Sequence, residues 1–196
     1  LTTDRDHRVN VQFSWQRGLV PNPGGLPHDT TADQEGNAPG DERSGTWVRV
    51  ALPSAGANWG SVFTPRINTE VPIAYVEADI DRPVITGQLY NGQDALPFAA
   101  GEDSGVNHGG TISGLHTHRL DASHGGGDYN QWVVDDATAQ MRMRMLSSYT
   151  QAELGLGHLI QQRANDAQRG HWRGMGFETS TQGWTTLRGG KGVLIS

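Results

Sequence analysis

The sequence contains no cysteine, and this absence removes several classes of protein at once. Disulfide scaffolds, zinc sites with cysteine ligands, iron–sulfur clusters and thiol catalysis all require that side chain. No apolar run approaches the roughly 20 residues that a membrane-spanning helix needs. Lys191 is the single lysine beside 14 arginines, and the net charge is −6. Because no apolar run is long enough, we expect no stable membrane insertion. Because the net charge is negative and there is no basic cluster, we expect no general nucleic-acid binding.

Large aliphatic and aromatic residues are also scarce. Leu, Ile, Val and Phe make up about 19 % of the 196 residues, which is the lower edge for a self-contained core. Glycine, in contrast, occupies 27 positions, roughly twice its normal usage. This composition favours a folded, turn-rich, all-β chain. We expect such a chain to complete its core with another copy of itself.

Alternation of apolar and polar residues predicts several short strands in the first 90 residues. The segment 7–15 places Val9, Val11, Phe13 and Trp15 on one face. The polar stretch 16–44, rich in Gly, Pro and Asp, predicts a long irregular loop. Further alternating segments follow at 46–52, 59–63, 70–77 and 83–90. Five short strands without a helical stretch predict a small closed barrel or a sandwich.

The pattern changes near Asn91. Residues 91–110 show no periodicity and are expected to form a neck. Beyond the neck, alternating segments predict strands at 111–120, 131–134, 140–146, 151–161 and 179–188. No helix or second sheet is predicted to cover these strands, so part of their surface needs a partner.

Two of these segments supply candidates for an assembly core. In 140–146 methionine and arginine alternate, so a methionine face lies opposite an arginine face, and we expect Arg142 and Arg144 to be solvated. In 151–161 aliphatic residues alternate in the same way. A core within one domain and a core between chains are both open interpretations. The residues that would form a core between chains are Met141, Met143, Met145, Leu154, Leu156 and Ile160.

A group of histidines suggests a metal site. His116 and His118 are two residues apart on a predicted strand, so their rings point to the same side. Such a pair suits zinc or nickel if a nearby turn supplies a third ligand. Solvated rings at polar strand positions are the simpler interpretation, and we expect no metal and no other cofactor. The remaining members of the group are His108, His124, Asp121 and Asp128.

The patterns that would indicate catalysis are weak. A glycosidase needs two carboxylates across a groove, whereas the pair Asp135-Asp136 between two strands is typical of a turn. No Gly-x-Ser-x-Gly nucleophile turn is present. The glycines at 189–192 lack the Gly-Lys-Ser/Thr order of a phosphate-binding loop. We therefore expect no enzyme.

Several stretches together form a family signature. They read DRDHRVNVQFSW at 4–15, WVRVA at 47–51, AGANWG at 55–60, FTPRI at 63–67 and EADIDRPVITG at 77–87. Downstream, TISG at 111–114 and YN at 129–130 continue the match. The pattern resembles the VgrG family, the spike proteins of type VI secretion systems, which are related to the central spike of contractile phage tails. Pro72 departs from the family pattern, and because it lacks a ladder donor we expect an edge or a bulge there.

The resemblance implies a domain plan. An oligonucleotide/oligosaccharide-binding (OB) barrel would span 1–91, a neck 92–110, and the start of an intertwined trimeric β-prism or β-helix stem 111–196. The chain begins without a methionine and ends in an apolar run, so we expect a fragment that omits the large N-terminal base of the family.

The resemblance also implies a function. It is that of a homotrimeric membrane-puncturing and effector-delivery spike without catalysis in this fragment. Its partners would be the Hcp tube ring, a PAAR-type tip protein and secreted effectors. The spike would be cytoplasmic in the assembled apparatus and then be injected into a target cell. The alternative is an OB-type module that binds nucleic acid or carbohydrate.

Overall fold

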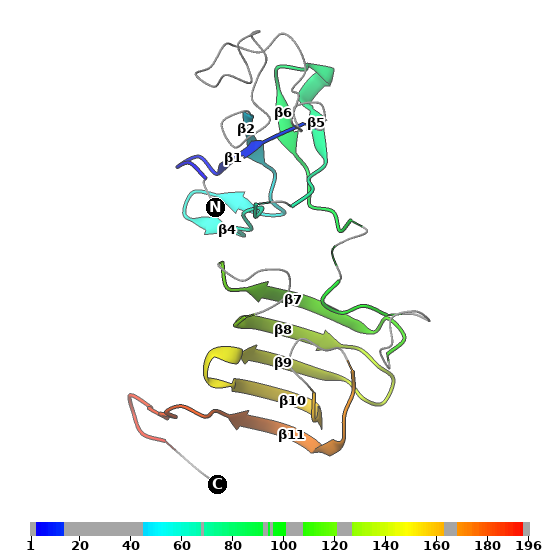
Figure 1. The fold of residues 1–196 in the computed structure, drawn as a ribbon. Coiled ribbons are helices and arrows are strands. Elements are labelled where there is room, and N and C mark those ends of the chain that lie inside the picture. The colour runs from blue at the N-terminus through cyan, green and yellow to red at the C-terminus, as the bar shows by residue number, and fades with distance from the viewer. Residues whose placement is uncertain are drawn as a thin grey trace. The chain divides into compact units, whose positions relative to one another are not determined.

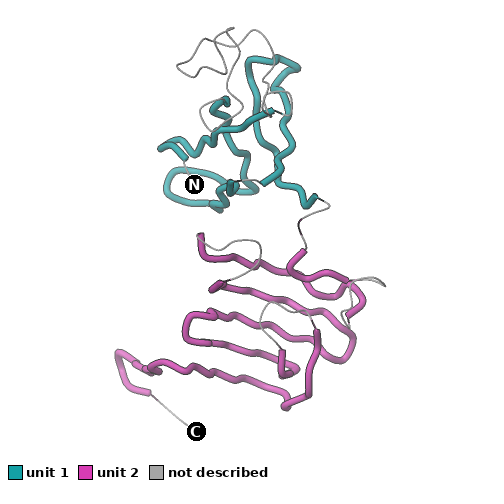
Figure 2. The backbone as a smooth tube through the Cα atoms, in the orientation of Figure 1, with its two compact units in different colours: residues 1–91 teal, residues 92–196 magenta. Residues whose placement is uncertain are grey.

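The computed structural model describes residues 3–13, 45–67, 69–91, 94, 96–100, 108–120, 127–162 and 168–193. Across these ranges the chain is all-β, which confirms the predicted fold class; two 3-10 turns, η3 at Val76–Ala78 and η5 at Ser148–Thr150, interrupt the strands. The same ranges hold no helix of the length and apolarity needed to cross a bilayer. The chain divides into two compact units, residues 1–91 and 92–196 (Figure 2). The predicted loop 16–44 lies outside the described residues, as does Trp15.

The first unit contains a four-stranded sheet and a separate hairpin. The sheet has the order β1-β2-β6-β5, in which only the β2–β6 pair is parallel. The hairpin joins β3 to β4. The strands span Arg8–Val11 (β1), Thr46–Val50 (β2), Ala55–Gly56 (β3), Trp59–Gly60 (β4), Ile73–Tyr75 (β5) and Pro83–Ile85 (β6).

Strands of this unit are shorter than the alternating patterns predict. Pro72 has no N–H to donate to a ladder, and β5 begins at the next residue instead of at residue 70. The strand predicted at 83–90 ends at Ile85, and the one predicted at 59–63 ends at Gly60. Among the described residues these strands form an open sheet and do not close into a barrel.

A small apolar core holds the first unit together. The two inward-facing valines of β1 pack against Val48 of β2 and Ile85 of β6. Half-buried Val50, Val71 and Ile73 surround this cluster. Few side chains form this core, and all seven belong to the described part of one chain.

The second unit is a five-stranded antiparallel meander. Each strand pairs with its neighbours in the chain, in the order β11-β10-β9-β8-β7 (Figure 1). Gly114 in β7 has φ +150, and a Cβ there would lie 1.9 Å from the carbonyl oxygen of Trp132, so only glycine fits this pairing. The strands span Ile112–His118 (β7), Tyr129–Asp135 (β8), Arg142–Ser147 (β9), Ala152–Ile160 (β10) and Trp172–Ser180 (β11).

The last strand differs from its prediction. The structure places it at 172–180 instead of 179–188. Gly174 and Gly176 alternate with Met175 and Phe177, and glycine lacks the β-branched side chain that normally indicates a strand. The local sequence therefore does not predict this strand. Its backbone pairing with β10, from Glu153 to Ile160, defines it instead.

The core of the first unit predicts a clear contrast between two isoleucines. Ile85→Ala removes a fully buried side chain and should destabilise the unit by about 2–5 kcal/mol, since it leaves a cavity. Ile80→Ala, at an exposed position, should change stability by about 0.5 kcal/mol or less. Chemical denaturation of the 196-residue chain measures both. Equal losses for the two variants would contradict the assigned core.

Candidate assembly surface of the C-terminal sheet

The register of β7–β11 sorts the side chains of the second unit into two faces, because neighbours along a strand point to opposite sides. Cross-strand partners share a face. One side, named the charged face, carries Gln131, Val133, Asp135, Arg142, Arg144 and Glu153. The other side, named the apolar face, carries Leu115, Trp132, Met143, Met145, Leu154, Leu156 and Phe177.

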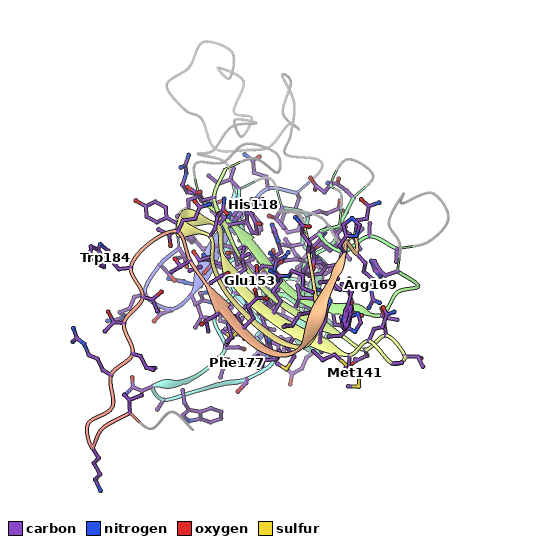
Figure 3. All side chains as sticks on the ribbon, turned by 90° about the horizontal axis from the view of Figure 1, so that it is seen from below. His118, Met141, Glu153, Arg169, Phe177 and Trp184 are labelled. Carbon is purple, nitrogen blue, oxygen red and sulfur yellow. The ribbon has the colours of Figure 1, made fainter. Side chains whose placement is uncertain are left out.

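The charged face is covered by the chain itself. Val133 is fully buried and packs with Ile112 and with Phe98 from the neck. Arg169, from the connection between β10 and β11, contributes a second part of the cover by reaching Asp135. Figure 3 shows Glu153 on the inner side of the curve that β11 describes, whereas Phe177 lies on its outer side.

Asp135 is the centre of the polar contacts on this face, and its side chain is 0 % exposed. One carboxylate oxygen, Oδ2, accepts from Arg142 Nε at 3.1 Å and from Arg169 Nη2. The other, Oδ1, accepts from Thr111 Oγ1 at 2.9 Å and from the Ala137 N–H at 3.2 Å. Four separate segments are thereby tied to one carboxylate.

The ionisation of Asp135 follows from these contacts. Burial raises the pKa of its carboxyl, because a charge loses its hydration there. Hydrogen bonds from Arg169, Thr111 and Arg142 act in the opposite direction and outweigh burial, so the pKa of Asp135 lies below its ordinary value. The carboxylate is therefore charged at neutral pH, as a partner of two guanidinium groups must be.

A second set of ion pairs extends across the sheet from Arg144. Its Nη2 donates to Glu153 Oε2 at 3.1 Å, and its Nη1 donates to Gln131 Oε1 at 3.3 Å. Arg173 of β11 lies 3.8 Å from the other oxygen of Glu153 and 2.8 Å from Glu178 Oε2. A network of side chains thus joins β8, β9, β10 and β11 on the charged face.

These contacts correct one prediction. Arg142 and Arg144 were expected on a solvated face, but both are buried. The alternation of methionine and arginine is as predicted, yet the arginines are the residues that the chain covers. The physical reason is that Asp135 and Glu153 lie on the same face and neutralise them, so that burial of the guanidinium groups is compensated.

The apolar face is the exposed side of the sheet. Met143 is 40 % exposed and Phe177 68 % exposed, and Leu115, Trp132 and Met145 are open to solvent as well. Scattered exposed apolar residues are normal on a protein surface, whereas a contiguous patch of large side chains indicates an interaction site. Here they lie on directly opposed positions of five adjacent strands, so they form one patch.

A groove of about 750 Å³ lies on this patch. Four of its lining residues are the cross-strand row Leu115, Trp132, Met145 and Leu154. Residues beyond the end of β11 form another wall, among them Trp184, whose side chain is fully exposed. The groove is therefore an apolar concavity that the described part of the chain leaves open.

The six candidates for a trimer core fall into two groups. Met141, Met143, Met145 and Leu156 are exposed, and Leu154 is partly buried beside them. Ile160 differs, since it is 7 % exposed within the single chain. The β10–β11 pairing shifts its register between Leu159 and Ile160, which interrupts the regular alternation there.

The histidines at 116 and 118 point to the same side of β7, as their spacing predicts, with ring centroids 4.7 Å apart. Gln131 Nε2 donates to Nδ1 of His116 at 3.2 Å. His108 is engaged by the backbone of Ala99 and Gly110. Within the described ranges no three His, Asp or Glu side chains gather into a metal site, and His124 and Asp121 lie outside those ranges.

The residues that sequence reasoning missed are the acidic partners of the buried arginines. Asp135 was interpreted as part of a turn, although it ends β8 on the same side as Gln131 and Val133. The two-residue spacing of Gln131, Val133 and Asp135 could have indicated that Asp135 continues the strand on the same face. The role of Arg169 could not be predicted from a local pattern, because its contact with Asp135 joins positions 34 residues apart.

The carboxylate of Asp135 allows a sharp stability test. Asp135→Asn should destabilise the second unit by about 3–5 kcal/mol, since it leaves the buried Arg142 and the partly buried Arg169 without their counter-charge. Asp136→Asn, at the exposed neighbour, should cost about 0.5 kcal/mol or less. Thermal unfolding at pH 7 measures both, and equal effects would contradict the assigned role.

The same residue predicts a response to acid. A carboxyl whose folded pKa is depressed stabilises the fold above its unfolded pKa, about 4, and loses that contribution as pH falls through the folded pKa. Wild-type stability should therefore fall below about pH 4. The asparagine variant should show a smaller fall over the same range.

Two family models match this chain. The model described as "Putative type VI secretion system Rhs element Vgr" matches residues 122–196, and the model of the "Type VI secretion system/phage-baseplate injector OB domain" matches residues 34–90. The first therefore covers β8–β11, and the second covers the strands of the first unit that follow β1.

Named relatives agree with these matches. The type VI secretion system spike proteins VgrG2a and VgrG2b of Pseudomonas aeruginosa are each 33 % identical over 96 % of this chain, which covers 19 % and 15 % of their lengths. VgrG3 of Vibrio cholerae is 30 % identical over 68 % of the chain and 10 % of its own length. The chain thus spans about a fifth or less of these relatives. On these matches it belongs to the VgrG family of type VI secretion spike proteins.

Proposed function

We propose that this chain is a structural segment of a type VI secretion spike and that it assembles as a homotrimer through the apolar face. The observation that carries the proposal is that the two faces of the sheet differ in what covers them. Charged groups are paired and covered inside one chain, whereas large apolar side chains remain exposed. Removing that apolar surface from water would stabilise the second unit.

A second copy of the chain is the occupant that fits this surface. Each copy presents the same patch, and closed symmetry lets every copy both offer and cover it. Met143 lies in the middle of the patch, between Val134 of β8 and Leu156 of β10. Methionine side chains adapt their shape to a facing surface, which suits an interface built around a shared axis.

The mechanical role follows from strand pairing. Separating strands in a sheet requires many ladder hydrogen bonds to break together, so a sheet-based stem resists shear. Covering the apolar face also removes a surface that would otherwise promote aggregation. We propose that the trimer serves membrane puncture and effector delivery in this way.

The proposed partners and location follow from the family. They are the Hcp tube ring, a PAAR-type tip protein and secreted effectors, with a cytoplasmic stage in the assembled apparatus before injection. We propose no catalysis for this segment. Asp135 and Glu153, two acids of the charged face, are both held by arginines, which supports a structural role for them.

Replacement of Met143 tests the proposed interface. Met143→Asp would place three carboxylates near one another in a buried trimer contact, and each unpaired buried charge costs several kcal/mol. The mass measured by light scattering should fall from three times the 21.2 kDa chain to a single chain.

Leu120→Asp is the matched control. Leu120 is 71 % exposed but follows β7 outside the apolar face, so this variant should keep the trimer mass. A wild-type chain that is monomeric at micromolar concentration would overturn the proposal. So would a trimer that survives Met143→Asp.

A further inference from the structure

Two methionines and a histidine lie in one cross-strand row of the second unit. His158 of β10 pairs with Met175 of β11. On its other side the N–H of His158 donates to the carbonyl oxygen of Met141 at 2.9 Å, just before β9 begins. Opposed residues share a face, and their Cβ atoms lie about 4.5–5.5 Å apart. Because Leu156 precedes His158 by two residues, this row lies on the apolar face, with an imidazole between two thioethers.

The backbone fixes the spacing of the row. Gly157 has φ +85, and a Cβ there would lie 2.5 Å from the carbonyl oxygen of Met141, so only glycine lets that segment approach β10. The pairing of β10 with β11 is regular at His158 and shifts only after Leu159. Backbone pairing therefore brings the three side chains together before any ligand binds.

The donor atoms of the row are accessible. Met141 is 66 % exposed and Met175 is 78 % exposed, and Figure 3 shows Met141 on the same side of the sheet as Phe177. The ring of His158 is half-buried and contacts the ring of Trp172, but within the described part of the chain it makes no hydrogen bond. Two sulfur atoms and a ring nitrogen are thus available to a ligand.

This set of donors suits a soft metal ion. Thioether sulfur and imidazole nitrogen both bind Cu(I). Zinc sites are instead built from thiolate, imidazole and carboxylate groups, and Mg²⁺ and Ca²⁺ take oxygen ligands. The row contains neither a thiolate nor a carboxylate, and its three ligands are neutral. A monovalent ion is therefore favoured over a divalent one.

Trp172 adds an aromatic ring beside the row. It pairs with Ile160, two residues beyond His158 in β10, and so lies on the same face. Its ring centroid is 6.5 Å from that of His158, with an angle of 31° between the ring planes. The face of an indole attracts a cation that lies within about 6 Å of the ring centroid. A cation bound at His158 would therefore gain from this neighbour.

We propose that Met141, His158 and Met175 bind one Cu(I) ion per chain, with the indole of Trp172 beside the ion. This site is separate from the histidine pair of β7. It is formed by one chain, so its test is independent of the mass measurement that tests the trimer.

Competition with a chromogenic Cu(I) chelator tests the site in the full 196-residue chain, at pH 7.5 and without oxygen. The wild-type chain should take one Cu(I) per chain from the chelator. Zn²⁺ in about tenfold excess should not displace it, because thioethers are poor zinc ligands. A chain that takes no Cu(I), or that releases it to Zn²⁺, would overturn the proposal.

Met141→Leu and Met175→Leu each remove one thioether and keep an exposed apolar side chain, so the fold should be retained. Each should weaken Cu(I) binding by about tenfold or more. Met145→Leu is the matched control, because Met145 is exposed on the same face but outside the row, and it should keep the wild-type affinity. His118→Gln should also keep it. Wild-type affinity in both Met141→Leu and Met175→Leu would contradict the site, and so would a loss in His118→Gln, which would place the ion on β7.

Discussion

Four segments of the second unit contact the carboxylate of Asp135. These contacts determine which face of the sheet the chain covers. Thr111 approaches from the start of β7, Ala137 from the turn after β8, Arg142 from β9 and Arg169 from the crossing to β11. A buried carboxylate is tolerated only when its lone pairs and its charge are matched. Here they are matched entirely by the same chain.

That match decides which face of the sheet is left for a partner. In a strand the two faces are fixed to each other, so burying Asp135, Arg142 and Arg144 necessarily turns Met143 and Met145 outward. If the chain instead covered the methionine face, the paired charges would be exposed to solvent. The methionines would then need a cover that one sheet alone does not provide. If the apolar face is the assembly surface, the ion pairs act on assembly indirectly, since they hold the apolar patch on the outside of each chain.

The sequence predicted which residues share a face but not which face is covered. The alternation in 140–146 separates methionine from arginine correctly, and the spacing of His116 and His118 places both rings on one side. Which of the two faces is buried depends on contacts such as that of Arg169 with Asp135. These contacts join distant positions and leave no local pattern in the sequence. β11 was misplaced because Gly174 and Gly176 interrupt its apolar alternation, so that the ladder with β10 defines the strand.

The two units differ in what they require from other copies of the chain. Val9, Val48 and Ile85 close a core inside the first unit, whereas the second unit completes only its charged face internally. If the apolar face binds further copies, the stability of the second unit becomes linked to chain concentration, while that of the first does not. The first unit can then fold before assembly and the second reaches full stability only within it. Under that proposal such an order would suit a spike, because the unit proposed to resist force would also be the unit that its neighbours stabilise.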